Sequence, residues 1–222
     1  MSGPADFATF ATFALYVRLL GVLGVPSFDY DADSRVRVIA GSLKGRRLKA
    51  PTWTGLRPTS DKLRETLFNV LAPRVAGSRV LDGYAGTGAI GIEAISRGAA
   101  AAVFVDSDRR ARALVADNLE HCGVPTGCAI IRSSFDRLDP LGPIDIFDLV
   151  LLDPPYDDPP AEVIAMVAHL VAPGGLLVIE HARRRTAPEA AAGLARTRQI
   201  TSGDSMLSFY ARPETPDIAC RP

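Results

Sequence analysis

Sulfur and imidazole ligands are scarce in this chain, and their spacing does not fit a metal site. The three cysteines, Cys122, Cys128 and Cys220, are an odd number without metal-ligand spacing, and the three histidines are scattered. Unclustered cysteines of this kind are typical of reduced thiols in the cytosol. The sequence therefore predicts a cytoplasmic protein with no metal site.

A secretion signal, a membrane span and internal repeats are also missing from the sequence. Residues 7–25 are apolar apart from Arg18, but no basic segment precedes them and no convincing small-residue cleavage site follows. The stretch is too short and too interrupted for a membrane span. We expect residues 1–34 to be a non-essential extension or a misassigned start, and we expect no membrane partner.

The chain does have enough apolar sequence for one sizeable core, with 222 residues of which 47% are hydrophobic. Strand patterns alternate with helical ones, which predicts an α/β fold with a mostly parallel, doubly wound sheet. The expected strands are 79–82, 102–106, 128–132, 146–152 and 176–180, followed by an antiparallel pair at 196–200 and 205–211. The expected helices are 88–97, 108–121 and 161–171, and Pro173-Gly174-Gly175 is expected to form a tight turn.

The motif Asp153-Pro154-Pro155-Tyr156 directly follows the apolar run at 146–152. The Asp153 carboxylate can accept one N–H of an exocyclic amine, and a carbonyl of the extended proline segment can accept the other. The Tyr156 ring offers a face on which a base can stack. Asp-Pro-Pro is also an ordinary strand-ending turn, but the motif favours chemistry on the exocyclic amine of a nucleobase.

A glycine-rich loop lies upstream, between a short apolar strand and a helical pattern. Residues 86–91, Gly-Thr-Gly-Ala-Ile-Gly, fit G-x-G-x-x-G, and Asp106 follows at the end of the next expected strand. In dinucleotide-binding folds such glycines allow close backbone approach, and an acid about 20 residues on holds the ribose hydroxyls. NAD and S-adenosylmethionine are both candidates for this layout.

Asp82 favours the methyl donor over the dinucleotide. It lies four residues before Gly86, at the strand end where a dinucleotide places its pyrophosphate. A carboxylate there would repel phosphate, whereas it would attract the ammonium and sulfonium of S-adenosylmethionine. We therefore predict that Asp82 lies at the methionine end of the donor and that Asp106 anchors the ribose.

The charge of the chain sums to zero but is unevenly spread. Between Arg35 and Arg64, nine residues are basic and only Asp61 is acidic. This bias favours a phosphate-backbone partner over a merely solvated face. Residues 36–39 and 46–49 are expected to form a small hairpin, and Thr59 or Ser60 is expected to cap the helix that follows. The RNA-binding candidates are Arg37, Lys44, Arg46, Arg47, Lys49 and Arg57.

Longer motifs resemble one bacterial family. In order they are Arg37-Val38-Ile39-Ala40-Gly41, Lys44-Gly45-Arg46-Arg47-Leu48, Arg57-Pro58-Thr59, Arg64-Glu65-Thr66-Leu67-Phe68-Asn69, Leu81-Asp82-Gly83-Tyr84-Ala85-Gly86-Thr87-Gly88, Glu93-Ala94-Ile95-Ser96-Arg97-Gly98-Ala99 and the Asp153 tetrapeptide. Over about Val36 to Arg212 the chain resembles the bacterial small-subunit ribosomal RNA guanine-N2 methyltransferases, the RsmD family.

The resemblance implies a Rossmann-like class I methyltransferase with a seven-stranded, mostly parallel sheet and a C-terminal antiparallel hairpin. It implies S-adenosylmethionine as donor and the N2 amine of one 16S rRNA guanine (the guanine-966 type) as target. We expect 16S rRNA within a small-subunit assembly particle as partner, with naked rRNA left open. The expected organisation is a basic RNA-binding hairpin and helix at 35–74, a methyltransferase domain at 75–212 and a tail at 213–222.

The sequence departs from the family pattern in two places. Gly83-Tyr84 replaces a larger apolar residue and Phe, and Ser134 stands where an Asp often binds the adenine amine. Adenine recognition is therefore expected from Ser134, a backbone amide and Phe135. The cofactor-binding candidates are Asp82, Tyr84, Gly86, Gly88, Asp106, Ser107, Ser134, Phe135 and Thr59.

Three other functions stay open on the sequence. An adenine-N6 DNA or RNA methyltransferase would use the same tetrapeptide, although the N-terminal motifs and the lack of a target-recognition domain weigh against it. A protein glutamine methyltransferase usually has Asn at position 153. A non-catalytic RNA-binding protein would need only the basic segment, and the acids Asp82, Asp106 and Asp153 argue against that function.

Overall fold

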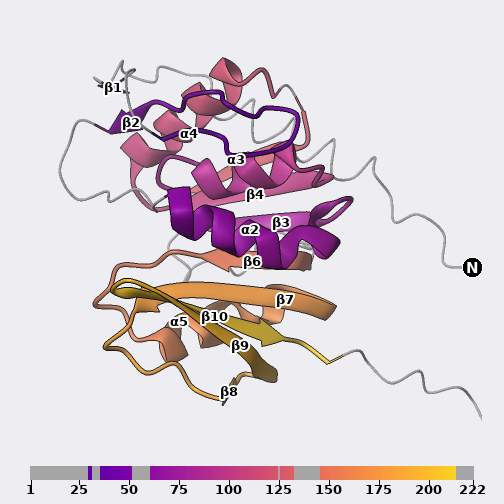
Figure 1. Cartoon of the computed structure of the whole chain (residues 1–222), viewed down its shortest axis with the longest axis vertical. Coiled ribbons are helices and arrows are strands. Elements are labelled where there is room, and N and C mark those ends of the chain that lie inside the picture. The colour runs from indigo at the N-terminus through magenta and orange to yellow at the C-terminus, as the bar shows by residue number, and fades with distance from the viewer. Residues whose placement is uncertain (1–29, 32–35, 52–60, 125, 133–145, 214–222) are drawn as a thin grey trace, which may run out of the picture. The chain divides into compact units, whose positions relative to one another are not determined.

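The computed structural model describes residues 30–31, 36–51, 61–124, 126–132 and 146–213. The chain forms two compact units, Met1–Ser134 and Phe135–Pro222. Figure 1 labels the helices and strands of both units. The predicted positions Thr59, Arg57, Ser134 and Phe135 lie outside the described residues.

Three parallel strands form the sheet of the first unit, in the order β5-β4-β3. They are β3 (Arg79–Gly83), β4 (Ala101–Asp106) and β5 (Cys128–Arg132). Strand β4 is a continuous run of buried apolar residues, as expected of a parallel strand that is covered on both faces. The register pairs Gly83 with Val105, so Asp82 and Asp106 lie at the same carboxyl edge of this sheet.

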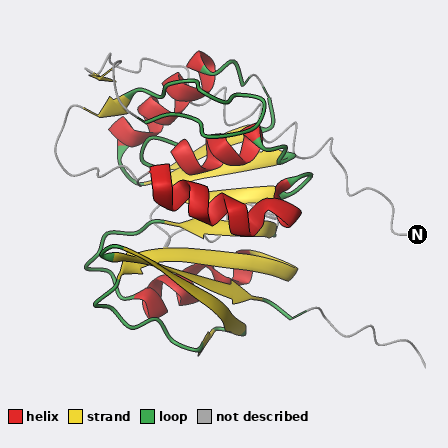
Figure 2. Cartoon of the chain, viewed as in Figure 1, coloured by secondary structure: helices red, strands yellow, loops and turns green. Residues whose placement is uncertain are grey.

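Helices α3 (Ala89–Ser96) and α4 (Arg109–His121) pack against β4, and α2 (Asp61–Val75) packs against α3 (Figure 2). Helix α4 buries a stripe of side chains at the i, i+3, i+4 and i+7 spacing that an amphipathic helix requires. Its N-cap, Asp108, accepts a hydrogen bond from the Arg110 amide at 2.8 Å. The hydrogen bond from the Arg110 side chain lowers the pKa of Asp108 below its ordinary value.

The residues from Val36 to Ala50 belong to the first unit. The expected hairpin forms, because Leu48 N donates to Val36 O at 2.8 Å and Arg37 and Arg47 form an antiparallel bridge. The apolar side chains of this hairpin are buried in one cluster with α3, β4 and α4. Strand β2 (Ala50–Pro51) then pairs antiparallel with β1 (Tyr30–Asp31).

The second unit has five strands in the order β6-β7-β10-β9-β8. Strands β6 (Phe147–Leu152) and β7 (Val171–Ala182) run parallel, and β10 (Ser205–Ala211) runs antiparallel to β7 and to β9 (Leu194–Ser202). Strand β8 (Ala190–Ala191) is a short edge partner of β9. Helix α5 (Pro160–Val167) and the 3-10 turn η2 (Ala168–Leu170) connect β6 to β7 and pack on β7.

One expected turn is a bulge instead. Strand β7 begins at Val171 and continues through Pro173-Gly174-Gly175, where a turn before the strand was expected. Phe147 pairs with Val171 but Leu149 pairs with Leu176, so the extra residues are looped out of the ladder. Gly174 takes φ 71°, and its amide donates to Arg212 O at 3.1 Å. Glycine allows this left-handed conformation without a Cβ clash. Turns use the same property of glycine, which is why the sequence motif predicts a turn.

The expected fold class is confirmed: the parallel strands β3, β4 and β6 are each followed by a helix, and β9 and β10 form an antiparallel hairpin after them. The strands β3 to β7, β9 and β10 match the seven that were expected, with β8 as an additional short edge. Among the described residues, no helix is both long and apolar enough to cross a membrane.

Candidate active site

Asp82 lies at the end of β3 and contacts the start of helix α3. Its side chain is buried, and its Oδ2 accepts a hydrogen bond from the amide of Gly91 at 2.8 Å. The amides of a helix's first turn lack helical acceptors and carry a partial positive charge. The Asp82 carboxylate therefore accepts a hydrogen bond from an amide at the start of α3. In a dinucleotide-binding fold, this helix end binds the pyrophosphate instead.

The three glycines of the G-x-G-x-x-G motif occupy positions where a side chain would be strained or would clash. Gly86 and Gly88 take φ of 54° and 76°, a region that L-residues rarely adopt. A Cβ on Gly91 would overlap the ring of Phe104 on β4. The G-x-G-x-x-G pattern is therefore required here by the turn and by the close packing of α3 on the sheet.

Asp106 holds the neighbouring loop together. Its Oδ2 accepts from Gly86 N at 3.0 Å and its Oδ1 from Asp108 N at 2.8 Å. Each carboxylate oxygen has a second lone pair. Asp106 thus joins the glycine loop to the turn containing Ser107, at the edge of the sheet that also carries Asp82.

Arg112 supports this turn and was not predicted. Its Nη1 donates to the carbonyls of Asp106 at 3.0 Å and Ser107 at 2.8 Å. Burial, followed by the charge of Arg132, lowers the pKa of Arg112 from its ordinary value. An arginine on a charged helix face gives no sequence signal of such a role.

Tyr84 has φ 62°, and it is half-buried at the start of the glycine loop. A bulky residue in the left-handed region is strained, and strain of this kind concentrates at functional sites. The unusual conformation coincides with the position where the sequence departs from the family pattern.

The Asp153 tetrapeptide lies in the second unit, directly after β6. Pro154 is buried, Pro155 is exposed, and Asp153 and Tyr156 are intermediate. The amide of Asp158 donates to Pro155 O at 3.0 Å, which closes a turn after the prolines. The carboxylate and the ring therefore project from a short, ordered loop.

The cations of the basic segment at residues 37–49 differ in the contacts that they make. Lys44, Arg46 and Arg47 are exposed, and Arg46 also donates to Cys122 O at 2.8 Å. Arg37 pairs with Asp61 at 3.3 Å, and Lys49 with Asp117 at 3.7 Å. Surface pairs of this kind contribute little to stability, so their cations can still meet a phosphate. Arg64, by contrast, is fully buried, and its Nη2 donates to Arg37 O at 2.8 Å.

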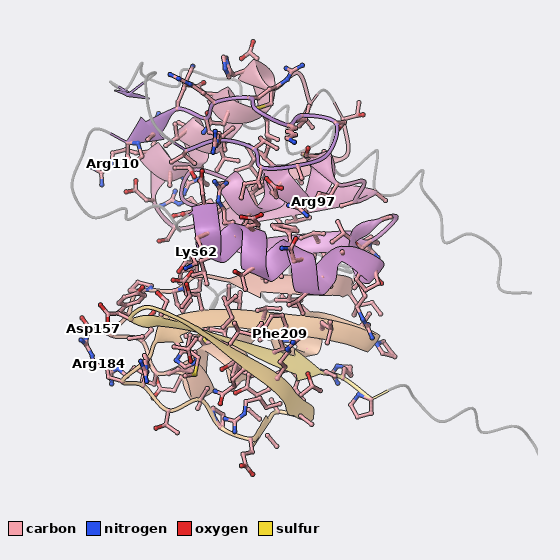
Figure 3. All side chains as sticks on the ribbon, viewed as in Figure 1. Lys62, Arg97, Arg110, Asp157, Arg184 and Phe209 are labelled. Carbon is pink, nitrogen blue, oxygen red and sulfur yellow. The ribbon has the colours of Figure 1, made fainter. Side chains whose placement is uncertain are left out.

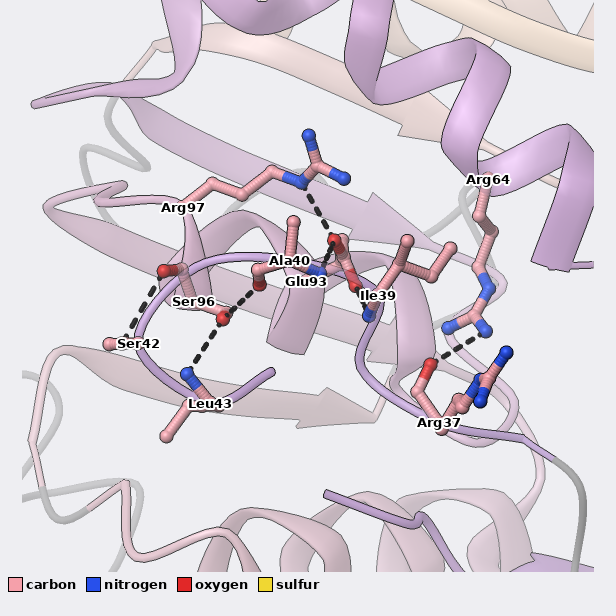
Figure 4. A network of polar contacts seen from close by, with 9 residues as sticks. All are labelled: Arg37, Ile39, Ala40, Ser42, Leu43, Arg64, Glu93, Ser96 and Arg97. Carbon is pink, nitrogen blue, oxygen red and sulfur yellow. Dashed lines mark hydrogen bonds and ion pairs between the residues drawn. The ribbon is translucent and has the colours of Figure 1, made fainter. Parts of the chain in front are cut away.

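A polar network fastens this segment to helix α3 (Figure 4). The buried Glu93 carboxylate accepts from the amides of Ile39 at 2.7 Å and Ala40 at 3.0 Å, and also from Arg97 Nε at 2.7 Å. Ser96 Oγ accepts from Leu43 N at 2.9 Å. The Ala40-Gly41 and Glu93-to-Ala99 motifs, which are far apart in the sequence, thus contact each other.

Asn118 makes a second connection, from helix α4. Its Oδ1 accepts from Lys49 N at 2.8 Å, and its Nδ2 donates to Lys49 O at 3.1 Å and to Thr87 O at 2.9 Å. Because Thr87 lies in the glycine loop, one buried side chain joins the basic segment to the predicted cofactor loop. No sequence pattern pointed to this residue.

The comparisons with known proteins agree on one family. The model of the family described as "Conserved hypothetical protein 95" matches residues 36–211. "Putative rRNA methyltransferase YlbH" of Bacillus subtilis is 36% identical over 182 residues, which cover 80% of this chain and 99% of that protein. "Ribosomal RNA small subunit methyltransferase D" of Haemophilus influenzae is 41% identical over 128 residues, which cover 57% of this chain and 66% of its own length.

A solved structure gives the same result. "Putative methyltransferase yhhF" from Escherichia coli superposes with a TM-score of 0.70 at 32% identity, and the match covers 81% of this chain and 99% of that one. The matched residues include the glycine loop, the Asp153 tetrapeptide and the N-terminal motifs. The chain belongs to the family described as "Conserved hypothetical protein 95", the RsmD family that its motifs resemble.

Proposed function

We propose that the chain is an S-adenosylmethionine-dependent methyltransferase that modifies the exocyclic N2 amine of a guanine, of the guanine-966 type, in 16S rRNA. The observation that carries the proposal is family membership over residues 36–211, together with one relative named as a putative rRNA methyltransferase and another named as a methyltransferase of small-subunit rRNA. The tetrapeptide at the end of β6 supplies the groups that such a target needs.

The predicted donor site fits a cationic ligand. Asp82 and Asp106 lie at the same edge of the first unit's sheet, and Asp82 already satisfies the amide of Gly91 at the start of α3. This edge repels a pyrophosphate and attracts an ammonium or sulfonium group. S-adenosylmethionine supplies an electrophilic methyl group when bound, and Asp82, Gly86, Gly88 and Asp106 would hold it.

The tetrapeptide would hold the acceptor. The amine of a guanine is a poor nucleophile because its lone pair is delocalised into the ring. Asp153 and the Pro154 carbonyl would accept hydrogen bonds from the two N–H groups of the amine, which favours a pyramidal nitrogen. Asp153 would then take up the proton that the amine loses. Tyr156 would stack on the base, and the loop mainly contributes alignment of the reactants.

The exposed cations of the hairpin would bind the RNA backbone around the target. Lys44, Arg46 and Arg47 project from a hairpin whose backbone is anchored on α3 and α4, so the charges are presented on a rigid support. Phosphate contacts of this kind position a nucleic acid without reading its sequence. A base that is turned out of its stack can then reach the Asp153 tetrapeptide.

The test is product identification. Labelled S-adenosylmethionine is supplied with naked 16S rRNA, small ribosomal subunits, DNA or protein extract, and the labelled nucleoside is identified after digestion. We expect N2-methylguanosine from rRNA or subunits. N6-methyladenosine, or label in protein, would contradict the proposal.

The variant Asp153→Asn tests the role of the carboxylate. We expect kcat to fall by at least about a hundredfold, because the side chain no longer accepts the proton. Asp157→Asn is a matched control, since this carboxylate lies in the same loop with 90% exposure. Full activity of the Asp153 variant would remove that residue from the mechanism.

A further inference from the structure

The hydroxyl group of Tyr156 is held by two side chains from strands that follow much later in the chain. Its Oη lies 2.6 Å from Ser205 Oγ and donates to Glu180 Oε1 at 3.4 Å. A carboxylate can only accept, so Tyr156 donates to Glu180 and the Ser205 hydroxyl donates to Tyr156. Tyrosine, unlike phenylalanine, can be held in this way.

Both partners are rigidly placed by the second unit's sheet. Glu180 is a buried residue of β7, and Ser205 is the first residue of β10, where it pairs with Ala182. Gly203, at φ 61°, lies in the two-residue turn between β9 and β10, and the Arg183 amide donates to Asp204 O at 2.7 Å. The tip of the hairpin is therefore fixed beside the end of β7.

The backbone of the same loop is held by Arg185. Its Nη2 donates to Asp157 O at 3.1 Å, and its Nε lies 3.4 Å from Tyr156 O. Figure 3 labels the neighbouring pair Asp157 and Arg184, which is a more exposed ion pair at 3.8 Å. Tyr156 is thus restrained at its carbonyl and at its phenolic oxygen.

Two hydrogen bonds to a phenolic oxygen also constrain the plane of the ring. The donor and acceptor directions of a phenol lie close to the ring plane. Partners at Ser205 and Glu180 therefore limit rotation about the axis from Cβ to Oη. A ring with a fixed plane is a preformed stacking surface, which lowers the cost of ordering on binding.

We infer that Glu180 and Ser205 are positioning residues that fix the plane of Tyr156 for stacking on the target base, with Arg185 fixing the loop backbone. The inference rests on the proposed function for the meaning of "target base". The contacts assign a part in substrate alignment to the C-terminal hairpin, in addition to its part in the fold.

The test compares Tyr156→Phe, Ser205→Ala and the double variant, with Ser202→Ala as control. Ser202 pairs with Ser205 across the same turn, so the control removes a hydroxyl from the same hairpin. We expect kcat on rRNA to fall about five- to tenfold in each single variant, as the loss of a hydrogen bond would produce. The KM for S-adenosylmethionine should stay unchanged and the melting temperature should fall by no more than roughly 2–4 °C, the effect of one lost hydrogen bond, which distinguishes positioning from loss of structure.

The double variant should be no slower than Tyr156→Phe, because Tyr156→Phe already removes the hydrogen bond that Ser205→Ala breaks. Additive losses, or wild-type rates in Tyr156→Phe, would overturn the inference. If the single variants fail to fold, their melting temperatures fall as well, and Glu180→Leu, which removes the acceptor of the Tyr156 hydroxyl, then serves as the remaining variant. An unchanged rate in a folded Glu180→Leu protein would likewise count against the inference.

A second readout does not depend on activity. The chain has five tyrosines, and fluorine NMR of protein labelled with 3-fluorotyrosine identifies the Tyr156 signal by its absence in Tyr156→Phe. Ser205→Ala should shift or broaden that signal, and Ser202→Ala should not. A changed signal in a protein that does not methylate guanine would refute the proposed function alone. An unchanged signal would refute the positioning role alone.

Discussion

At the scale of single residues, several motif positions are explained by space and backbone conformation. Gly41 and Gly45 both adopt left-handed φ, 86° and 84°. A Cβ on Gly41 would overlap the carbonyl oxygen of Ser96, whereas nothing lies within 4 Å of a Cβ on Gly45. The two glycines therefore separate the cost of conformation from the cost of a clash.

This difference gives a paired prediction. Gly45→Ala should lower the free energy of unfolding by ~1–2 kcal/mol, the cost of a left-handed L-residue. Gly41→Ala should lower it by at least about 3 kcal/mol, because the overlap with α3 is added. Urea denaturation of both variants measures the difference, and equal losses would show that the hairpin moves away from α3 without cost.

At the scale of elements, strands β7 and β10 are joined by a buried polar pair as well as by the ladder. His181 Nε2 lies 2.9 Å from Ser208 Oγ, and Gln199 Nε2 donates to the same oxygen at 2.9 Å. Burial is the main cause that lowers the pKa of His181 below 6.5, and the charge of Arg196 acts in the same direction. The folded protein therefore favours the neutral imidazole.

The sign of the pH dependence follows from this shift. Below the ordinary pKa of 6.5 the unfolded chain binds a proton that folded His181 does not, so stability falls as pH decreases toward the lowered pKa. We expect urea midpoints at about pH 7.5 and 5.5 to differ less in His181→Gln than in the wild type. His169→Gln, at an exposed position, should keep the wild-type difference. If His181→Gln keeps the wild-type difference between the two urea midpoints, the pH dependence of stability arises from other groups.

At the scale of the whole molecule, the family match begins at Val36, whose side chain is already buried. A chain that begins at Val36 keeps the hairpin, its contacts with α3 and α4, and every described site residue. We expect it to fold and to methylate rRNA at the wild-type rate. Circular dichroism and the labelled-donor assay check this, with the full-length chain as reference, and loss of methyl transfer would show that residues 1–35 are required.

The order of elements could be predicted because β3, β4 and β6 are short apolar runs, each with a helical pattern after it. The glycine loop and the tetrapeptide could be predicted because their chemistry depends on adjacent residues. The contacts that hold the site residues in place could not be predicted from the sequence. Ser205 meets Tyr156, and Asn118 meets Lys49, only because separate elements pack together, and a serine or an asparagine is ordinary in its local sequence. The bulge at Pro173-Gly174-Gly175 was predicted as a turn, because the same residues suit both.

The side-chain amide of Asn118 has a consequence for how the first unit opens. It bonds both to Lys49 and to Thr87, so the two segments are held to α4 through one and the same side chain. We expect segments that share an anchor to open together, so that their amide protons show similar opening free energies in hydrogen exchange. Loosening of the hairpin at residues 36–49 would therefore also reduce the protection of the glycine loop.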